Sequence, residues 1–323
     1  MVPFEPLFRN PHLQTIAGHY WRRPAVDPRF PIERKYYRTE PDVQVLVESQ
    51  RPAGPAKGEL VMVHGLEGSG AAVYIRSLSL AALAAGFAVH RFNMRTCGGT
   101  EHLCTTLYHA GLTSDLLTVV RELKSADRGP VFLAGFSLGG NVVVKLAGEL
   151  GESGPQFLGG VCGVSAALDL AACSASIARP ENRIYESRFV RRMRRRLCDT
   201  GRYSERDFAE LRTVRAIDDR ITAPSFGFGD AANYYRTQSA INHMDRLHVP
   251  LLLIYAQDDT LVPRDIFEAP KVAANPWVER LPTEHGGHLG FLGRKPHRFW
   301  LDTAIVDWLQ KLTSQRISKS DSP

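Results

Sequence analysis

The sequence predicts an α/β protein in which helices cover both faces of a mostly parallel sheet and a helical cap is inserted late in the chain. Between residues 59 and 165, short apolar segments alternate with helical segments, a pattern typical of a doubly wound parallel sheet. The alternation stops at about residue 166 and resumes at residue 251. We therefore expect an insertion between two strands of one sheet.

Apolar periodicity places each strand and helix in turn. Strands are expected where short apolar or alternating segments occur, at 32–39, 43–49, 59–63, 87–93, 131–134, 157–165, 251–256 and 278–281. Helices are expected at 77–85, 112–125, 141–150 and 297–312. The second strand illustrates the period of two, because Val43, Val45 and Val47 fall on one face.

These elements divide the chain into four regions. Residues 1–30 are rich in proline and aromatic side chains, and we expect an irregular arm packed on the body. Residues 31–165 and 248–313 form the expected α/β core, and residues 166–247 form the helical cap. The polar end of the chain, SQRISKSDSP at 314–323, is expected to be a disordered tail.

Composition excludes several classes of protein. With 44% hydrophobic and 23% charged residues the chain has a globular composition. Its net charge of +6 permits attraction to phosphate or to an anionic membrane surface but is too diffuse to establish either, and no nucleic-acid partner is expected. Five cysteines do not form the dense, even-numbered framework of small secreted domains. The N-terminus lacks a signal-peptide pattern, and the longest apolar stretch is shorter than the ~20 residues of a membrane span. We therefore expect a cytoplasmic protein.

The motif GFSLG at 135–139 follows an apolar strand and opens a helix. This is the context of a nucleophile elbow, in which a sharp turn projects a serine oxygen above the sheet and glycines allow the turn. The alternative is a glycine-rich turn with an incidental serine, which the flanking pattern disfavours. The motif predicts Ser137 as a nucleophile.

A nucleophilic serine needs a base and an orienting acid, which follow it in the chain order serine, acid, histidine. The loop after strand 251–256 supplies Asp258 and Asp259, and the loop after strand 278–281 supplies His285 and His288. Both loops lie at the carboxyl ends of strands, where α/β folds bind ligands. From the residues alone, both pairs remain candidates.

A second loop is placed to bind a developing oxyanion. HGLEGS at 64–69 directly follows a strand. In hydrolases with a nucleophile elbow, such a loop donates one backbone N–H and the residue after the serine donates another. The expected donors are Leu66 and Leu138.

Together these motifs resemble the AB hydrolase superfamily, AB hydrolase 4 family, a group of YheT-like and ABHD-like serine esterases. The resemblance spans nearly the whole chain and rests on NPHLQT (10–15), HGLEGS (64–69), NMRTCGG (93–99), YHAG (108–111), GFSLGGN (135–141), DD (218–219), GF (227–228), YY (234–235), QDDTLVP (257–263) and GGHLGF (286–291).

The resemblance implies an α/β-hydrolase fold with neither cofactor nor metal ion. It selects Asp259 as the acid, because the family acid lies four residues before the proline of its turn. It selects His288 as the base, because that histidine belongs to the G-H-x-G-F motif. One departure is Thr96, where the family often has glycine, and this puts the shape of the 93–99 loop in question.

Two other patterns, a zinc cluster and a phosphate-binding loop, are weaker alternatives to the serine-hydrolase site. A zinc cluster would use Cys97, His102, Cys104 and His109, but their spacing matches no standard structural site. The glycines at 65, 68 and 70 resemble a phosphate loop, yet no lysine follows at P-loop spacing.

The predicted cap contains a basic run, residues 188–196. Its arginines are Arg188, Arg191, Arg192, Arg194, Arg195 and Arg196. Phe189, Met193 and Leu197 recur every four residues, which predicts an amphipathic helix with the arginines outward. We favour a solvated face over contact with an anionic membrane or a phosphate-bearing acyl donor, and Tyr234 and Tyr235 are expected to pack within the cap.

The expected function is that of a serine esterase, through a Ser137–His288–Asp259 triad, on small-molecule carboxylic esters with short or medium acyl chains, acylglycerols among them. One alternative is an acyltransferase, in which an alcohol resolves the same acyl-enzyme. A second alternative, from another class, is a non-catalytic lipid-binding module, disfavoured because all three triad positions are filled.

Overall fold

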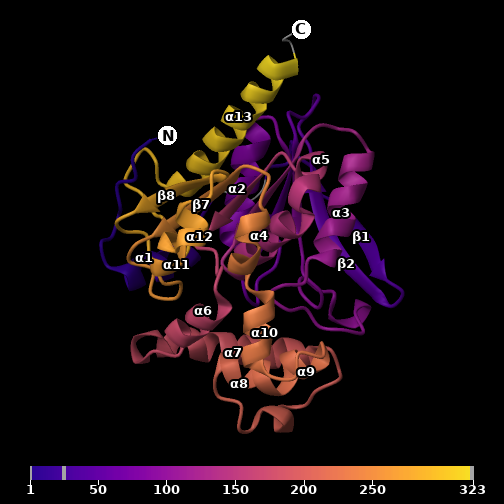
Figure 1. Cartoon of the computed structure of the whole chain (residues 1–323), viewed down its shortest axis with the longest axis vertical. Coiled ribbons are helices and arrows are strands. Elements are labelled where there is room, and N and C mark those ends of the chain that lie inside the picture. Colours follow the sequence, from indigo (N-terminus) through magenta and orange to yellow (C-terminus); the bar gives the residue numbers. More distant parts are fainter. Residues whose placement is uncertain (1, 24–26, 321–323) are drawn as a thin grey trace.

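The computed structural model describes residues 2–23 and 27–320, the last four of them by backbone alone. An eight-stranded sheet in the order β1-β2-β4-β3-β5-β6-β7-β8 organises the body (Figure 1). The strands are β1 (Glu33–Glu40), β2 (Val43–Gln50), β3 (Glu59–Val63), β4 (Ala88–Phe92), β5 (Val131–Phe136), β6 (Gly160–Val164), β7 (Leu251–Ala256) and β8 (Val278–Thr283). β2 pairs antiparallel with β1 and β4, and all other pairings are parallel. The predicted mostly parallel α/β fold is confirmed.

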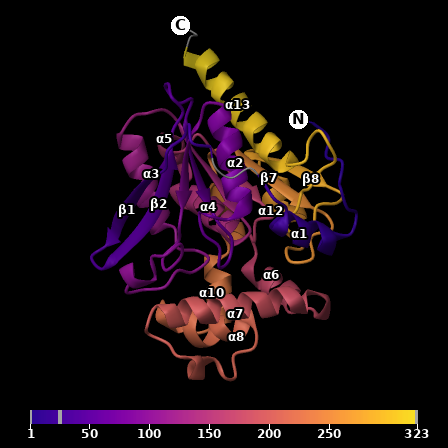
Figure 2. The same cartoon turned by 180° about the vertical axis from the view of Figure 1, so that it is seen from behind.

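Helices cover both faces of this sheet. α2 (Val73–Ala84) and α13 (Trp300–Ser320) pack on one face, and α3 (Ser114–Ser125) and α4 (Leu138–Leu150) pack on the other (Figures 1 and 2). In β3, Leu60 and Met62 belong to the core under α2 and α13, and Val61 and Val63 belong to the core under α3 and α4. Because successive side chains point to opposite faces and both faces are buried, residues 60–63 of β3 are all apolar.

A helical segment joins β6 to β7, and we call residues 166–247 the cap segment. In Figures 1 and 2 most of its helices gather at one end of the molecule, below the sheet, whereas residues 240–246 pack against α4. They are α6 (Leu170–Ile177), η3 (Pro180–Asn182), α7 (Arg183–Asp199), η4 (Glu205–Phe208), α8 (Val214–Ile217), η5 (Asp218–Thr222), α9 (Ala223–Ser225), α10 (Ala231–Gln238) and η6 (Ala240–Arg246). The segment has a small core of its own, which includes Met193, Leu197 and Phe208.

The remaining helices are short, apart from one near the N-terminus. They are α1 (Pro11–Tyr20), η1 (Glu101–Leu103), η2 (Gly151–Ser153), α5 (Gly154–Phe157), α11 (Asp265–Glu268) and α12 (Pro270–Ala273). Among the residues that the structure describes, no helix has both the length and the apolar character required to span a bilayer.

The structure differs from the sequence prediction at both ends of the chain. Within the expected irregular arm, residues 11–20 form α1, which Asn10 caps by accepting a hydrogen bond from the Leu13 N–H at 3.0 Å. Its buried positions are Gln14 and Gly18, whereas its apolar residues at helical spacing, Leu13, Ile16 and Tyr20, are exposed. The expected disordered tail is also wrong as far as Ser320, because α13 continues to that residue through a stretch without glycine or proline to end it. Residues 321–323 lie outside the described residues.

Candidate active site

Ser137 occupies the turn between β5 and α4. Its φ of 54° lies in the left-handed region, a strained conformation that clusters at functional sites. A Cβ atom on Gly139 would lie 2.4 Å from the carbonyl oxygens of Val63 and His64, and one on Gly135 would lie 2.2 Å from that of Gly139. Both glycines are therefore required for the serine to stand above the sheet, as the elbow motif predicts.

The structure brings Ser137, His288 and Asp259 into one hydrogen-bonded chain. Ser137 Oγ lies 2.9 Å from His288 Nε2, and His288 Nδ1 lies 2.9 Å from Asp259 Oδ2. The other carboxylate oxygen of Asp259 accepts hydrogen bonds from the backbone N–H groups of Leu261 and Val262, at 2.9 and 3.1 Å. These two N–H groups fix the carboxylate, which in turn orients the imidazole.

Asp258 and His285, the other two candidates, lie together and outside this chain. Asp258 Oδ2 is 3.4 Å from His285 Nδ1. Asp258 Oδ1 accepts a hydrogen bond of 2.8 Å from the backbone N–H of Gly287, next to His288. This pair therefore shapes the loop that carries His288 but makes no contact with Ser137.

Leu66 and Leu138, the expected oxyanion donors, line the same pocket as Ser137 and His288. Leu138 is the first residue of α4, so its N–H has no partner within the helix. The loop of Leu66 is held from beneath by His64, whose Nδ1 donates to Gly65 O at 2.8 Å and whose Nε2 accepts from Met94 N–H at 3.2 Å. Burial lowers the pKa of His64 to about 4, so this histidine is neutral.

Helix α1 contacts the loop of His288, a contact that the sequence did not predict. Thr15 Oγ1 accepts a hydrogen bond of 2.8 Å from the backbone N–H of His288 and donates one of 2.7 Å to Pro11 O. The Gln14 amide donates to Leu292 O at 3.0 Å and accepts from Leu292 N–H at 3.2 Å. Asn10 followed by Pro11 is a helix-start signal, which could have identified α1 within the NPHLQT motif.

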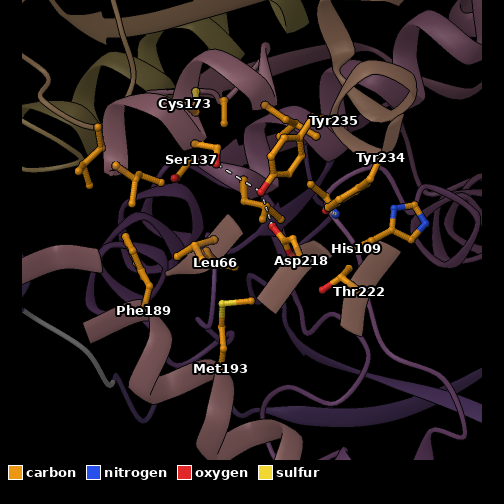
Figure 3. Close-up of a pocket in the computed structure, with 18 of the residues that line it drawn as sticks. Leu66, His109, Ser137, Cys173, Phe189, Met193, Asp218, Thr222, Tyr234 and Tyr235 are labelled. Carbon is orange, nitrogen blue, oxygen red and sulfur yellow. Dashed lines mark hydrogen bonds between the residues drawn. The ribbon is translucent and has the colours of Figure 1, made fainter. Parts of the chain in front are cut away.

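A largely apolar pocket opens beside Ser137. Its apolar lining combines the core with the cap segment: Leu66, Leu138, Leu170, Ile177, Phe189, Met193, Val214, Leu261 and Val262. Figure 3 shows Phe189 and Met193 facing the pocket from the side opposite Ser137. An acyl chain is the kind of group that such a lining accommodates.

One carboxyl group also lines this pocket. Asp218 is buried, and its Oδ2 accepts a hydrogen bond of 2.7 Å from the Tyr235 hydroxyl (Figure 3). Burial raises the pKa of Asp218 to about 6, although hydrogen bonds from Tyr235 and Thr222 partly offset this. Tyr234 packs beside Tyr235, and its hydroxyl accepts from the Ala110 N–H at 2.7 Å.

The prediction that the arginines of residues 188–196 all point outward is wrong for Arg196. Its Nε donates to the two carboxylate oxygens of Glu67 at 2.9 and 3.0 Å, and its Nη1 donates to Thr96 Oγ1 at 2.8 Å. Thr96 has a φ of 59°, the left-handed conformation that suits the glycine common in the family. Arg196 therefore ties the cap segment to two loops of the core.

Across the described residues, no group of three or more His, Cys, Asp or Glu side chains is arranged to hold a metal ion. Of the four residues weighed for zinc, Cys97 and Cys104 are buried thiols, and burial raises the pKa of both. His109 packs among Phe226, Phe228 and Tyr234, and burial lowers its pKa to about 3.

Comparison with known proteins places this geometry in a family. Residues 60–300 match the alpha/beta hydrolase family. The chain is 33% identical to YheT of Escherichia coli over 314 residues, which cover 94% of this chain and 91% of that protein. It is 27% identical to a monoacylglycerol lipase of Saccharomyces cerevisiae, covering 86% and 64% of the two chains, and 28% identical to phospholipase ABHD3 of Mus musculus, covering 72% and 58%.

The fold is also that of solved esterase structures. The Pyrococcus furiosus esterase Pf2001 superposes with a TM-score of 0.60 at 17% identity, over 90% of this chain and 99% of that one. The sheet order, the sequence match over residues 60–300 and the similarity to YheT along nearly the whole chain agree. This chain belongs to the alpha/beta hydrolase family, in its YheT- and ABHD-like branch.

Proposed function

We propose that this protein is a serine hydrolase that cleaves carboxylic esters. The observation that carries the proposal is the hydrogen-bonded chain Ser137–His288–Asp259 at a largely apolar pocket. The names of two relatives, a monoacylglycerol lipase and a phospholipase, support a substrate in which an acyl chain is joined through an ester.

In the first half of the reaction, Ser137 Oγ attacks the ester carbonyl carbon while His288 Nε2 takes the hydroxyl proton. The carbonyl oxygen becomes an oxyanion that accepts hydrogen bonds from the N–H groups of Leu66 and Leu138. Asp259 accepts the Nδ1 proton of His288 in a hydrogen bond and stabilises the imidazolium. His288 then returns the proton to the leaving alcohol oxygen, which leaves an acyl group on Ser137.

In the second half, water attacks the acyl-enzyme carbonyl as His288 accepts a proton from it. The tetrahedral intermediate collapses, His288 protonates Ser137 Oγ, and the carboxylic acid is released. Every proton transfer goes through His288 Nε2, which lies 2.9 Å from Ser137 Oγ. No group other than these side chains and backbone amides is needed for the cycle.

The test compares wild-type protein with Ser137→Ala, using hydrolysis of p-nitrophenyl butyrate and stoichiometric labelling by a fluorophosphonate. We expect Ser137→Ala to lose labelling and to lose up to roughly 10⁶-fold in kcat. Ser174→Ala is the matched control, because Ser174 lines the same pocket but bonds to Tyr235. Near-normal turnover by Ser137→Ala would refute the proposal. Preferred formation of a new ester when alcohol is added would identify an acyltransferase instead.

A further inference from the structure

Four large apolar side chains are exposed on α1 and at the start of α7. Leu13 is 53% exposed, Ile16 43%, Tyr20 68% and Ile184 75%. The first three are spaced by three and four residues, so they lie along one face of α1. The buried positions Gln14 and Gly18 lie on the opposite face. The exposed side chains therefore form a continuous apolar line pointing away from the body.

The two helices lie against each other, which makes their exposed faces a single surface. His12 Nδ1 is 3.0 Å from the Tyr185 hydroxyl, and Arg188 Nη1 donates to the Tyr20 hydroxyl at 2.8 Å. Figures 1 and 2 both place α1 beside the first turns of α7. We call the exposed faces of α1 and α7 together the α1–α7 surface.

Arginines extend this surface along α7. Ile184, Arg188, Arg191 and Arg195 recur at intervals of four, three and four residues, which places them in one narrow arc of the helix. Arg191, Arg192 and Arg195 are exposed. Burial and the cations of Arg188, Arg192 and Arg23 lower the pKa of His19, so positive charge reaches the end of α1.

Two acidic residues lie next to these arginines, but they do not neutralise the positive charge. Asp199 Oδ2 is 3.8 Å from Arg195 Nε, and Glu181 is exposed just before α7. The exposed charged residues of α7 are Arg183, Arg191, Arg192, Arg195 and Asp199. The surface therefore combines exposed apolar side chains with a net positive charge.

We propose that the α1–α7 surface docks on an anionic lipid bilayer. Leu13, Ile16, Tyr20 and Ile184 enter the interfacial region, and the exposed Arg191, Arg192 and Arg195 contact lipid phosphates. Interfacial helices have this combination of Leu, Ile and aromatic residues with Arg. A second copy of this chain fits less well, because a symmetric contact through this surface would bring the exposed arginines of the two α7 helices against one another.

Both helices of this surface also contact the proposed active site. The opposite face of α7 contributes Phe189, Met193 and Arg196 to the pocket, and Thr15 on α1 bonds the backbone of His288. Docking would therefore hold the pocket next to a layer in which acyl esters dissolve. The inference goes beyond the proposed function and does not depend on it, because binding to a bilayer requires no turnover.

The test is co-sedimentation of the full chain with vesicles of phosphatidylcholine, with and without phosphatidylserine. Wild-type protein should sediment with the anionic vesicles and much less with the neutral ones. Arg191→Ser/Arg195→Ser should weaken partitioning by about 25-fold, since each basic residue near an anionic surface contributes a factor of about five. Ile16→Ser/Ile184→Ser should weaken it on both kinds of vesicle, because it removes apolar contacts.

The controls remove two exposed arginines, or two exposed apolar side chains, elsewhere on the protein. Arg121→Ser/Arg128→Ser removes the same charge at exposed positions on or next to α3, across the body from α1, and Ile32→Ser/Trp277→Ser removes exposed apolar side chains. Both controls should bind like wild type, and all four variants should keep p-nitrophenyl butyrate turnover. Equal losses in controls and test variants, absence of wild-type binding, or self-association abolished by Ile16→Ser/Ile184→Ser would overturn the proposal. Vesicle binding without any ester turnover would instead refute the proposed function alone.

Discussion

Arg196 of α7 and Glu67 of the loop after β3 form a buried ion pair, with Arg196 Nε 2.9 and 3.0 Å from the two carboxylate oxygens. Their side chains are only 10% and 3% exposed. Tyr108 adds to the pair, because its hydroxyl donates to Glu67 Oε1 at 3.0 Å and accepts from the Glu67 N–H at 3.1 Å. Glu67 directly follows Leu66, so the cap segment helps to set the position of a proposed oxyanion donor.

Replacing Arg196 by methionine should therefore reduce both stability and turnover. The substitution leaves the Glu67 carboxylate buried without its counterion, which costs roughly 3–5 kcal/mol in the free energy of unfolding. We expect kcat to fall by roughly 10- to 100-fold, less than the ~10²–10³ lost with an oxyanion donor itself. Urea unfolding and steady-state kinetics measure the two effects.

Arg195→Met is the matched control, because the Arg195 side chain is 86% exposed and its loss should change stability by no more than about 0.5 kcal/mol. Adding Glu67→Gln to Arg196→Met should recover part of the stability, since it removes the unpaired charge. Equal behaviour of Arg195→Met and Arg196→Met would show that the ion pair has no such role.

Substitutions at the two acid candidates and at the two histidine candidates should have clearly different effects on turnover. Asp259→Asn should lower kcat by roughly 10⁴-fold, because an asparagine favours the wrong imidazole tautomer, and His288→Ala should be at least as damaging. Asp258→Asn keeps an oxygen acceptor for the Gly287 N–H, so it and His285→Ala should stay within about tenfold of wild type. Purified variants assayed for kcat/KM give the ranking, and a reversed order would overturn the assignment.

Thr15→Val tests whether α1 positions the histidine. Valine preserves the shape of threonine but removes the acceptor for the His288 N–H, and an unsatisfied buried donor costs roughly 1–3 kcal/mol. We expect kcat to fall with little change in KM, because the acyl pocket is untouched. Thr15→Ser retains the oxygen and should restore kcat; a serine variant as impaired as the valine one would indicate a general packing role.

Asp218 should make the protein less stable as the pH rises. Its pKa is raised from 3.8 to about 6 in the folded state, so between these values the folded state holds a proton that the unfolded state has lost. The free energy of unfolding should thus fall as pH increases from about 4 to about 6, by up to roughly 3 kcal/mol. Asp218→Asn should flatten this part of the urea-unfolding profile; Asp302, with a similar pKa, contributes equally to both proteins. An unchanged profile would contradict the expectation.

The parts of the fold and site that could be predicted from sequence are those written in local patterns. Strand β7 is an unbroken apolar run and β3 is apolar after Glu59, and the predicted bounds of both strands match the structure. Ser137 lies in the motif GFSLG, in which a Cβ atom on either glycine would clash with backbone oxygens. The residue pattern alone could not separate Asp259 from Asp258. The family turn selects Asp259, whose Oδ2 lies 2.9 Å from His288 Nδ1.

What could not be predicted depends on contacts between distant segments. Leu13, Ile16 and Tyr20 of α1 have helical spacing but are exposed, whereas Gln14 and Gly18 are the residues that pack on the His288 loop. The apolar periodicity therefore does not reveal which face of α1 is buried. Arg196 resembles its five neighbouring arginines in sequence, and only the position of Glu67, 129 residues earlier, turns it inward. When a polar residue bonds to a residue far away in the sequence, the sequence around it does not indicate which residue that is.

The last prediction concerns acyl-chain length. The cap segment supplies Ile177, Phe189, Met193 and Val214 to the pocket lining, so it should close one end of the space for the acyl chain. Each buried methylene contributes about 0.8 kcal/mol, which raises kcat/KM by up to roughly 15-fold per two carbons until the pocket is full. We therefore expect a maximum at short to medium chains and weak activity on long-chain triglyceride emulsions. The measurement is kcat/KM against acyl length at monomeric substrate concentrations.

Met193→Ala should lengthen the space and move this maximum to longer chains, because the removed side chain is buried and faces the pocket. Ile184→Ala changes the outward face of the same helix and should leave the maximum where it is. A kcat/KM profile that is flat, or that keeps rising through palmitate in the wild-type protein, would mean that the acyl chain leaves the pocket without meeting the cap segment. In that case Met193→Ala would have no effect on chain preference, and the lining residues of α6 and α7 would belong to the space for the leaving alcohol.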